Sequence, residues 1–308
     1  MSQAKIVVVG SSNTDMVVRS PRIPRGGETL LGSDFTMVPG GKGANQAVCA
    51  AKLGAEVTFV ARIGDDVFGE RSLDNFRSVG LDTRLITRDK TAASGIALIT
   101  VDDKGENAIV VAPGANYQLS PQDVDSAADK IKLADIVLIQ LEIPPQTVDY
   151  TIELAHRIGV KVVLNPAPIR PMSREIVKMV DVLVPNQHEA AELIGRAGQG
   201  DALDAPNAAE QLLRMGAKKV VITLGSRGAY ATDGKVGDYV DSIKVTPVDT
   251  TAAGDAFTAS LSCALAEGLD LFEAARFANR AAAIAVTRLG AQSSLPTRAE
   301  VDSQLCGN

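Results

Sequence analysis

Residues 38–64 read VPGGKGANQAVCAAKLGAEVTFVARIG and contain one complete turn, helix and strand. Three glycines surround Lys42 and mark a tight turn. A helical pattern follows at 44–53, and 56–64 is a continuous apolar run, as expected for a strand covered on both faces. Repeated units of this kind predict an α/β protein with a parallel sheet.

The same alternation continues on both sides of this unit. Further apolar, β-branched runs predict strands at 5–10, 134–142, 161–166, 180–186 and 218–225. Helical patterns lie at 67–79, 121–132, 145–158, 187–194 and 205–215, and two alanine-rich helical segments follow at 253–267 and 270–287. The length of 308 residues fits one large domain with an insertion, or two domains.

Two stretches interrupt the alternation and predict a small separate sheet. Residues 11–38 hold short extended runs around a Pro/Gly turn, and residues 93–113 read as a hairpin around DDKGE. The hairpin is apolar on both faces, Ile96 and Leu98 on one and Ala97, Ile99 and Val101 on the other. We expect one face to close over a ligand and the other to form a homodimer. The alternative is a plain extension of the core sheet.

The composition is that of a soluble globular protein, with 45% hydrophobic and 22% charged residues. A net charge of −6 without a basic run argues against nucleic-acid binding. The opening apolar run is too short for a signal peptide, and no run approaches the length of a membrane span, so we expect a cytoplasmic protein. Cys49, Cys263 and Cys306 form no CxxC pair and are expected to be reduced. The two histidines, His156 and His188, argue against a histidine zinc site or a Ser-His-Asp triad.

Polar residues follow several of the predicted strands. In open parallel sheets, ligands bind outside the carboxyl ends of the strands, so these residues are expected on one rim. They are Asn13, Asp15, Glu142, Asn165, Asn186, Thr223, Gly225 and Ser226. Turn chemistry alone is the alternative explanation for most of them.

The glycine-rich turn around Lys42 matches no standard phosphate-binding motif. Walker A requires GxxxxGK[ST], but Gly43 stands at the Ser/Thr position and Thr36 at the first glycine. The GxGxxG fingerprint also fails, which argues against a nucleotide-dependent dehydrogenase. Close backbone approach, the Lys42 cation and the Asn45 amide suit a polyhydroxylated ligand. The alternative is a helix N-terminus capped by Asn45.

The segment DTTAAGDAFTASL (249–261) carries the stronger chemical signal. A turn of small residues leads into a helix, whose free N–H groups at Ala252, Ala253 and Gly254 are expected to form an anion site. Asp255 lies at the same helix start, where the dipole favours its ionised form. A carboxylate base beside an anion site suits phosphoryl transfer to an alcohol. A purely capping role for Asp255 is the alternative.

These motifs together resemble the ribokinases of the PfkB carbohydrate kinase family over nearly the whole chain. Two long motifs carry the resemblance, residues 40–69 and residues 249–261. Shorter ones are GSSNTD (10–15), NPAP (165–168), PNQHE (185–189), ITLGSRGAY (222–230) and AVTRLGAQSSLP (285–296). The resemblance implies a single kinase domain over 1–308, a ribokinase-like three-layer sandwich whose mainly parallel central sheet is flanked by helices. It also implies a small β-sheet lid inserted as about 11–38 and 93–113.

The resemblance also implies a role for each matching residue. The sugar is expected to contact Asn13, Asp15, Gly41, Lys42, Gly43, Asn45 and Glu142. Asp255 is implied to be the catalytic base, beside an anion hole formed by Ala252, Ala253 and Gly254. ATP is expected along Asn186, Thr223, Gly225, Ser226, Arg227, Gly228, Gly254 and Asn279, although the family often has His at the last position.

Two cations are implied in the same way. Glu189 of NQHE is expected to act through water on Mg²⁺. A monovalent cation, usually K⁺, is implied at Asp249, Thr251, Ala285, Arg288, Gly290 and Ser294.

The activity expected from this resemblance is ATP-dependent phosphorylation of D-ribose at its 5-hydroxyl. The Asn-x-Asp spacing of GSSNTD is the feature that favours ribose. The alternatives are a kinase for 2-deoxyribose, another sugar or a nucleoside, and a non-catalytic sugar sensor.

Overall fold

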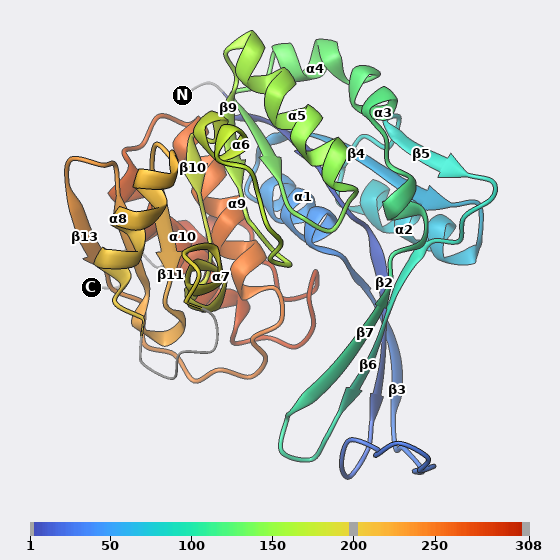
Figure 1. Ribbon diagram of the computed structural model, residues 1–308. Coiled ribbons are helices and arrows are strands. Elements are labelled where there is room, and N and C mark those ends of the chain that lie inside the picture. The colour runs from blue at the N-terminus through green and yellow to red at the C-terminus, as the bar shows by residue number, and fades with distance from the viewer. Residues whose placement is uncertain (1–2, 197–202, 304–308) are drawn as a thin grey trace.

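The structure is a computed structural model that describes residues 3–196 and 203–303. Figure 1 shows a layered α/β body from which a long β arm projects. The body contains a nine-stranded sheet in the order β13-β12-β11-β10-β9-β8-β1-β4-β5. Its parallel strands are β1 (Lys5–Val9), β4 (Glu56–Gly64), β5 (Ile86–Asp89), β8 (Ile136–Ile139), β9 (Lys161–Leu164), β10 (Val182–Leu183) and β11 (Val220–Thr223). Two antiparallel strands, β12 (Ala229–Thr232) and β13 (Gly237–Val240), complete one edge.

Helices cover both faces of this sheet, which confirms the expected three layers (Figure 1). Alternate residues of β1 reach opposite cores, Ile6 and Val8 on one side and Val7 and Val9 on the other. The first core is closed by α1 (Lys42–Lys52), α2 (Val67–Ser78), α9 (Ala253–Ala266), α10 (Leu271–Ala285) and α11 (Arg298–Ser303). The second is closed by α3 (Pro121–Asp125), α4 (Ala128–Lys132), α5 (Pro145–Ile158), α6 (Arg174–Met179), α7 (Gln187–Leu193) and α8 (Ala205–Met215).

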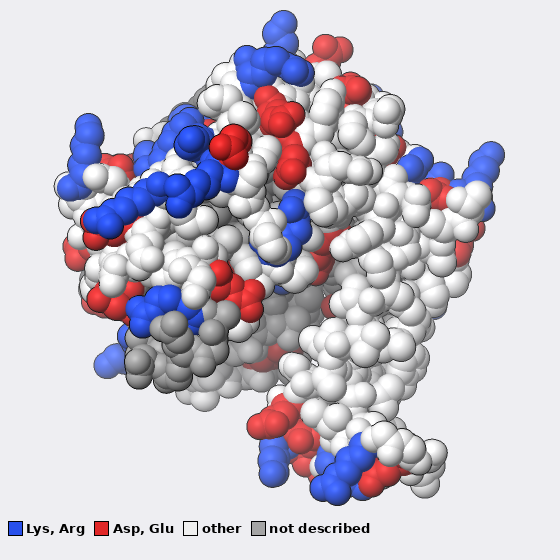
Figure 2. All heavy atoms as spheres, in the orientation of Figure 1, with Lys and Arg blue, Asp and Glu red and all other residues white. Residues whose placement is uncertain are grey.

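The arm is a four-stranded sheet in the order β3-β2-β6-β7. Its strands are β2 (Asn13–Arg19), β3 (Phe35–Gly40), β6 (Gly95–Val101) and β7 (Asn107–Ala112). One face, which includes Ala97 and Ile99, lines a cavity beside the body. On the other face Leu98 and Val110 are 51% and 67% exposed. Figure 2 shows charged side chains gathered at the end of the arm and an uncharged stem.

Several local expectations differ from the structure. The helix expected over 121–132 is two short helices, α3 and α4, separated at Ser126 and Ala127. The strands β5, β12 and β13 and the helix α6 were not predicted. The strands β5, β12 and β13 have four residues each and lack the continuous apolar run that marks a strand covered on both faces, and α6 has only six residues, too few for a clear helical pattern. Cys49 and Cys263 are free and buried, while Cys306 lies outside the described residues. In the described ranges, no helix has both the length and the apolar character to cross a bilayer.

Gly43 brings the start of α1 against the end of β1. A Cβ at this position would lie 2.4 Å from the backbone N of Ser11 and 2.6 Å from the carbonyl carbon of Gly10. Backbone atoms cannot yield as a side chain can, so only glycine permits this approach. The contact places Lys42 and Asn45 beside the first residues of the arm.

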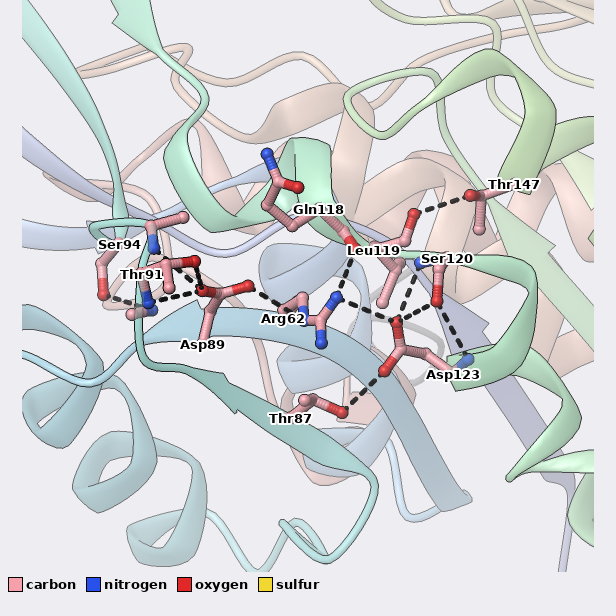
Figure 3. A network of polar contacts seen from close by, with 12 residues as sticks. Arg62, Thr87, Asp89, Thr91, Ser94, Gln118, Leu119, Ser120, Asp123 and Thr147 are labelled. Atoms are coloured by element: carbon pink, nitrogen blue, oxygen red, sulfur yellow. Dashed lines mark hydrogen bonds and ion pairs between the residues drawn. The ribbon is translucent and has the colours of Figure 1, made fainter.

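A network of polar contacts holds the root of the arm, which is formed by the chain segments just before β6 and just after β7 (Figure 3). Arg62 of β4 lies between Asp89 and Asp123, with Nε 3.4 Å and Nη1 3.6 Å from their carboxylates, and Nη1 also donates to the carbonyl of Gln118 at 2.6 Å. Asp89 accepts bonds from the N–H groups of Thr91 and Ala92. The chain enters the arm just after Asp89 and leaves it just before Gln118, so the network joins both segments to the sheet.

We predict that Asp89→Asn destabilises the protein in a pH-dependent manner. Hydrogen bonds from Ala92 and Thr91 lower the pKa of Asp89 to about 2. Its ionised form therefore stabilises the fold above the ordinary pKa of 3.8, and this contribution is lost as the pH falls toward 2. We expect urea unfolding at pH 7 to show a loss of about 1–2 kcal/mol, with a smaller difference at pH 3. Asp103→Asn, at an exposed position between β6 and β7, is the control. An equal difference at both pH values would contradict the assignment.

Candidate active site

Three adjoining cavities run along the carboxyl ends of the central strands. The lid cavity, about 730 Å³, lies between the arm and the body; the central cavity is about 220 Å³ and the apolar cavity about 380 Å³. The lid and central cavities share Lys42, Thr250, Ala252 and Asp255. The central and apolar cavities share Thr223, Thr250, Ala253 and Gly254. The start of α9 therefore lies where the three spaces meet.

Asp255 is held by α1 rather than by its own helix. Its side chain is 6% exposed, and it accepts bonds from Asn45 Nδ2 at 2.8 Å and from Gln46 Nε2 at 2.9 Å. The N-cap of α9 is Ala252, and that of α1 is Gly41, neither with a side-chain cap. The capping alternatives for Asp255 and Asn45 are therefore wrong, because both side chains are committed to the contact between the two helices.

A buried chain of amides stands behind Asp255. Gln46 Nε2 also donates to Asn165 Oδ1 at 3.1 Å, and Gln46 Oε1 accepts from Gln140 Nε2 at 2.6 Å. Gln46 and Gln140 are fully buried. Sequence reasoning missed both, although Gln46 follows Asn45 directly and Gln140 comes directly after β8, on the rim that holds the other polar residues.

The lid cavity collects nearly all of the residues expected to bind sugar. They are Asn13, Asp15, Gly41, Lys42, Asn45, Glu142 and Asp255, while Gly43 is buried behind them. Glu142 accepts bonds from Ser11 Oγ at 2.5 Å and from the N–H of Lys42 at 3.0 Å. The set offers carboxylates and amides to a ring of hydroxyl groups.

The charges in this cavity influence one another strongly. Burial, reinforced by Glu142 and Asp255, raises the pKa of Asp15 to about 6, although Lys42 opposes the shift. Burial lowers the pKa of Lys42, but four carboxylates led by Asp255 outweigh it, so its pKa is raised and the ammonium stays charged.

The start of α9 presents unpaired N–H groups to the central cavity. Ala252 has a positive φ of 59°. Within the described ranges, the N–H groups of Ala252, Gly254 and Asp255 have no hydrogen-bond acceptor. The N–H of Ala253 donates to the carbonyl of Thr250 at 3.2 Å, so it is not free as the sequence had suggested. The left-handed residue at 252 explains this, because it closes a turn over residues 250–253.

The apolar cavity receives most of the residues expected along ATP. Gly225, Ser226, Gly228, Gly254 and Asn279 line it, with apolar walls that include Phe257 and Val286. Thr223 lines both this cavity and the central one, and Asn186 lines the central one. Arg227 lines none of the three and donates instead to the side chain of Gln187. Asn279 Nδ2 donates to the carbonyls of Val240 and Asp241.

The residues expected around Mg²⁺ form a capping box at the start of α7. Asn186 Oδ1 accepts from the N–H of Glu189, and both Glu189 oxygens accept from Asn186. Burial raises the pKa of Glu189, which lines the central cavity opposite the start of α9. A carboxylate retains further lone pairs when each oxygen accepts one bond, so its chemistry fits a Mg²⁺ ion held through water.

The residues expected around a monovalent cation lie together beside the lid cavity. Asp249 accepts from the N–H groups of Thr251 and Gly290, and these three residues line the cavity. Ala285, Arg288 and Ser294 lie behind it; the Ala285 carbonyl accepts from the N–H of Arg288, and Ser294 is buried. Carboxylate and carbonyl oxygens are donors that suit a hard cation.

Comparisons with known proteins agree with this geometry. Residues 3–298 match the pfkB family of carbohydrate kinases. The chain is 43% identical to the ribokinase of Bacillus subtilis over 97% of its own length and 99% of that protein. Its structure is similar to that of Thermotoga maritima ribokinase, with a TM-score of 0.90, 39% identity and coverage of 99% and 100%. A ribokinase of Arabidopsis thaliana complexed with ribose and ATP also superposes with a TM-score of 0.90, at 31% identity and full coverage of both chains.

We predict that Asp15→Asn stabilises the protein above pH 6. Well below the ordinary pKa of 3.8 the carboxyl group is protonated in both the folded and the unfolded state, so its ionisation does not affect stability. Above the raised pKa of about 6, the folded protein bears the full cost of a buried charge. We expect urea unfolding to show a gain of about 1–3 kcal/mol at pH 7.5 and almost none at about pH 3. Asp103→Asn again serves as the control, and a less stable Asp15→Asn protein at pH 7.5 would refute the expectation.

Proposed function

The chain belongs to the pfkB family of carbohydrate kinases, and we propose that it transfers the γ-phosphoryl group of ATP to the 5-hydroxyl of D-ribose. The products are D-ribose 5-phosphate and ADP. The observation that carries this proposal is the meeting of three cavities at Asp255 and the start of α9. The lid cavity has room for the sugar, the central cavity for the phosphates and the apolar cavity for the nucleoside. The reacting atoms would meet at the start of α9, which borders all three.

In this proposal the sugar lies in the lid cavity with its 5-hydroxyl toward Asp255. Asn45 and Gln46 fix both carboxylate oxygens, so Asp255 is positioned to accept the proton of that hydroxyl. Asp15, Glu142 and Asn13 supply contacts to the other hydroxyl groups. A base held in one orientation favours attack by the hydroxyl over attack by water.

The phosphoryl group lies in the central cavity. The N–H groups of Ala252, Gly254 and Asp255 point to its negative charge, with the dipole of α9 behind them. Lys42 is charged and lines both this cavity and the lid cavity. Together these groups stabilise the charge that develops as the group is transferred.

The nucleoside of ATP lies in the apolar cavity. Phe257 and Val286 contact the base, and the loop at Gly225, Ser226 and Gly228 lies against the nucleotide. Arg227 and Asn186 are proposed at the outer end of the phosphates. The Nδ2 group of Asn279 is already bonded to two carbonyls, so its oxygen is the group we assign to the nucleotide.

Two cations complete the proposal. Glu189 would hold Mg²⁺ through water, and the ion would neutralise the phosphates of ATP. Asp249, Thr251, Ser294 and the carbonyls of Ala285, Arg288 and Gly290 would hold K⁺ beside the start of α9. Replacing K⁺ by Na⁺ in the assay is expected to lower the rate at fixed ionic strength; an unchanged rate would remove the K⁺ assignment.

We further propose that residues 1–308 are one kinase domain in the cytoplasm. The arm, inserted as about 11–38 and 93–113, would act as a lid. The free thiols of Cys49 and Cys263 fit a reducing compartment. The exposed outer face of the arm, which includes Leu98 and Val110, supports a homodimer formed through the arms.

The assay that tests the reaction is ADP release with a panel of sugars and nucleosides in the presence of Mg²⁺ and K⁺. D-ribose is expected to give the highest kcat/KM. Equal or faster turnover of 2-deoxyribose would transfer the assignment to that sugar. A protein that binds ribose without consuming ATP would be a sensor.

We predict that Asp255→Asn abolishes phosphoryl transfer and retains sugar binding. The amide has nearly the same shape but cannot accept the proton, so kcat is expected to fall about 10²–10⁴-fold. Calorimetry should show a ribose Kd within about tenfold of the wild-type value. Asp238→Asn, an exposed aspartate on β13, is the matched control. A kcat within tenfold of wild type would exclude Asp255 as the base.

We also predict that Val110→Asp disrupts the homodimer. Val110 is 67% exposed on the outer face of the arm, and a carboxylate there would be buried without a partner in a dimer. Sedimentation at about 10 μM should show a dimer for wild type and a monomer for the variant. Val236→Asp changes a valine that is 59% exposed and lies outside the arm, and this variant should remain dimeric. A monomeric wild-type protein would disprove the dimer.

A further inference from the structure

Of the two polar atoms in the Asn13 side-chain amide, the oxygen forms a hydrogen bond and the nitrogen does not, within the described residues. Its side chain lines the lid cavity and is 5% exposed. The Oδ1 atom accepts a bond from Asn116 Nδ2 at 2.7 Å. Within residues 3–196 and 203–303, the Nδ2 atom of Asn13 has no hydrogen-bond acceptor. An amide that is satisfied at its oxygen and free at its nitrogen can donate to an acceptor that enters the cavity.

The direction of this bond follows from a backbone group that can only donate. The N–H of Ser12 donates to Asn116 Oδ1 at 2.8 Å, which identifies that atom as the oxygen. Asn116 Nδ2 must then face the other two partners, the carbonyl of Ser12 at 3.1 Å and the Oδ1 of Asn13. The oxygen of Asn13 is therefore taken, and its nitrogen faces the cavity.

The hydrogen bond between Asn116 and Asn13 has room to form because residue 95 of the arm is a glycine. Gly95 is the first residue of β6 and pairs in register with Asn13 of β2. A Cβ at Gly95 would lie 2.2 Å from Asn116 Nδ2 and 2.3 Å from Asn13 Oδ1. Any side chain here would occupy the position of the bond and push the two amides apart. Asn116 itself is 2% exposed in a 3₁₀ turn (Gly114–Gln118) directly after the arm.

We propose that Asn116 is a positioning residue that makes Asn13 a hydrogen-bond donor to one hydroxyl group of the sugar. This inference rests on the proposed function, because it takes the lid cavity as the sugar site. Asn116 touches no sugar. It favours a sugar that has an acceptor oxygen at this point, because an analogue without that oxygen leaves the N–H group of Asn13 without this partner.

Two variants disrupt the hydrogen bond between Asn116 and Asn13, one by changing a partner and one by filling the space that the bond occupies. Asn116→Asp keeps the shape but places a carboxylate oxygen against both Asn13 Oδ1 and the carbonyl of Ser12. The Asn13 amide must then turn over and present its oxygen to the sugar, while the repulsion from the Ser12 carbonyl remains. Gly95→Ala displaces the two amides without changing either. Asn207→Asp on α8 and Gly26→Ala, whose Cβ would meet no atom within 4 Å, are the matched controls.

The experiment is a calorimetric cycle of variants against sugars, measured without ATP. The sugars are D-ribose and the three analogues that lack the hydroxyl at carbon 1, 2 or 3. Asn116→Asp is expected to raise the Kd for ribose about tenfold or more, and Gly95→Ala to act in the same direction. One of the three analogues lacks the hydroxyl group that accepts from Asn13. For that analogue Asn116→Asp should raise the Kd less than about threefold.

A merely structural role would give a different pattern. An equal loss on all four sugars, or an unchanged Kd for ribose, would overturn the proposal. If Asn116→Asp does not fold, Gly95→Ala decides the question alone. Wild-type ADP release is measured in parallel; binding of ribose without ATP consumption would remove the kinase assignment while the binding cycle would still test the role of Asn116.

Discussion

The site depends on the contact between the starts of α1 and α9, which are separated by more than 200 residues in the chain. Asn45 and Gln46 donate to the two oxygens of Asp255 across this contact. Gly43 makes it possible, because any larger residue would hold α1 away from the end of β1. Asp255, the unpaired N–H groups of α9 and Lys42 come together as a consequence of this one approach.

Bringing these groups together has an electrostatic cost. Four carboxylates, those of Asp15, Glu142, Glu189 and Asp255, interact with the ammonium group of Lys42. Burial first, and then the charges of Glu142 and Asp255, raise the pKa of Asp15 to about 6 although Lys42 opposes the shift. A ligand that brought hydrogen-bond donors or positive charge to these carboxylates would reduce this cost and stabilise the folded protein. Function and stability therefore make opposite demands on the same carboxylates, as is common at catalytic sites.

The arm connects sugar recognition to the architecture of the body. Its root is held by Arg62 between Asp89 and Asp123, and its first residue, Asn13, is oriented by Asn116 from the segment that leaves the arm. The polar contacts that join the arm to the body lie at its root, whereas the outer face of the stem carries apolar side chains such as Leu98 and Val110. Different residues therefore hold the arm to the body and line the cavity beside it.

The sequence by itself determined the α/β class, the parallel sheet, the extra small sheet and most of the rim residues. Continuous apolar runs and the two long glycine-containing motifs are local patterns that can be recognised in the sequence alone. Only the tertiary structure decided that Asn45 and Asp255 bond to each other instead of capping their helices, and that Ala253 is not free to bind an anion. It alone revealed Gln46, Gln140 and Asn116, because a buried amide acquires its partner from a distant segment. Hydrogen-bond direction depends on which donors and acceptors packing brings within about 3 Å, and no local pattern of residues contains that information.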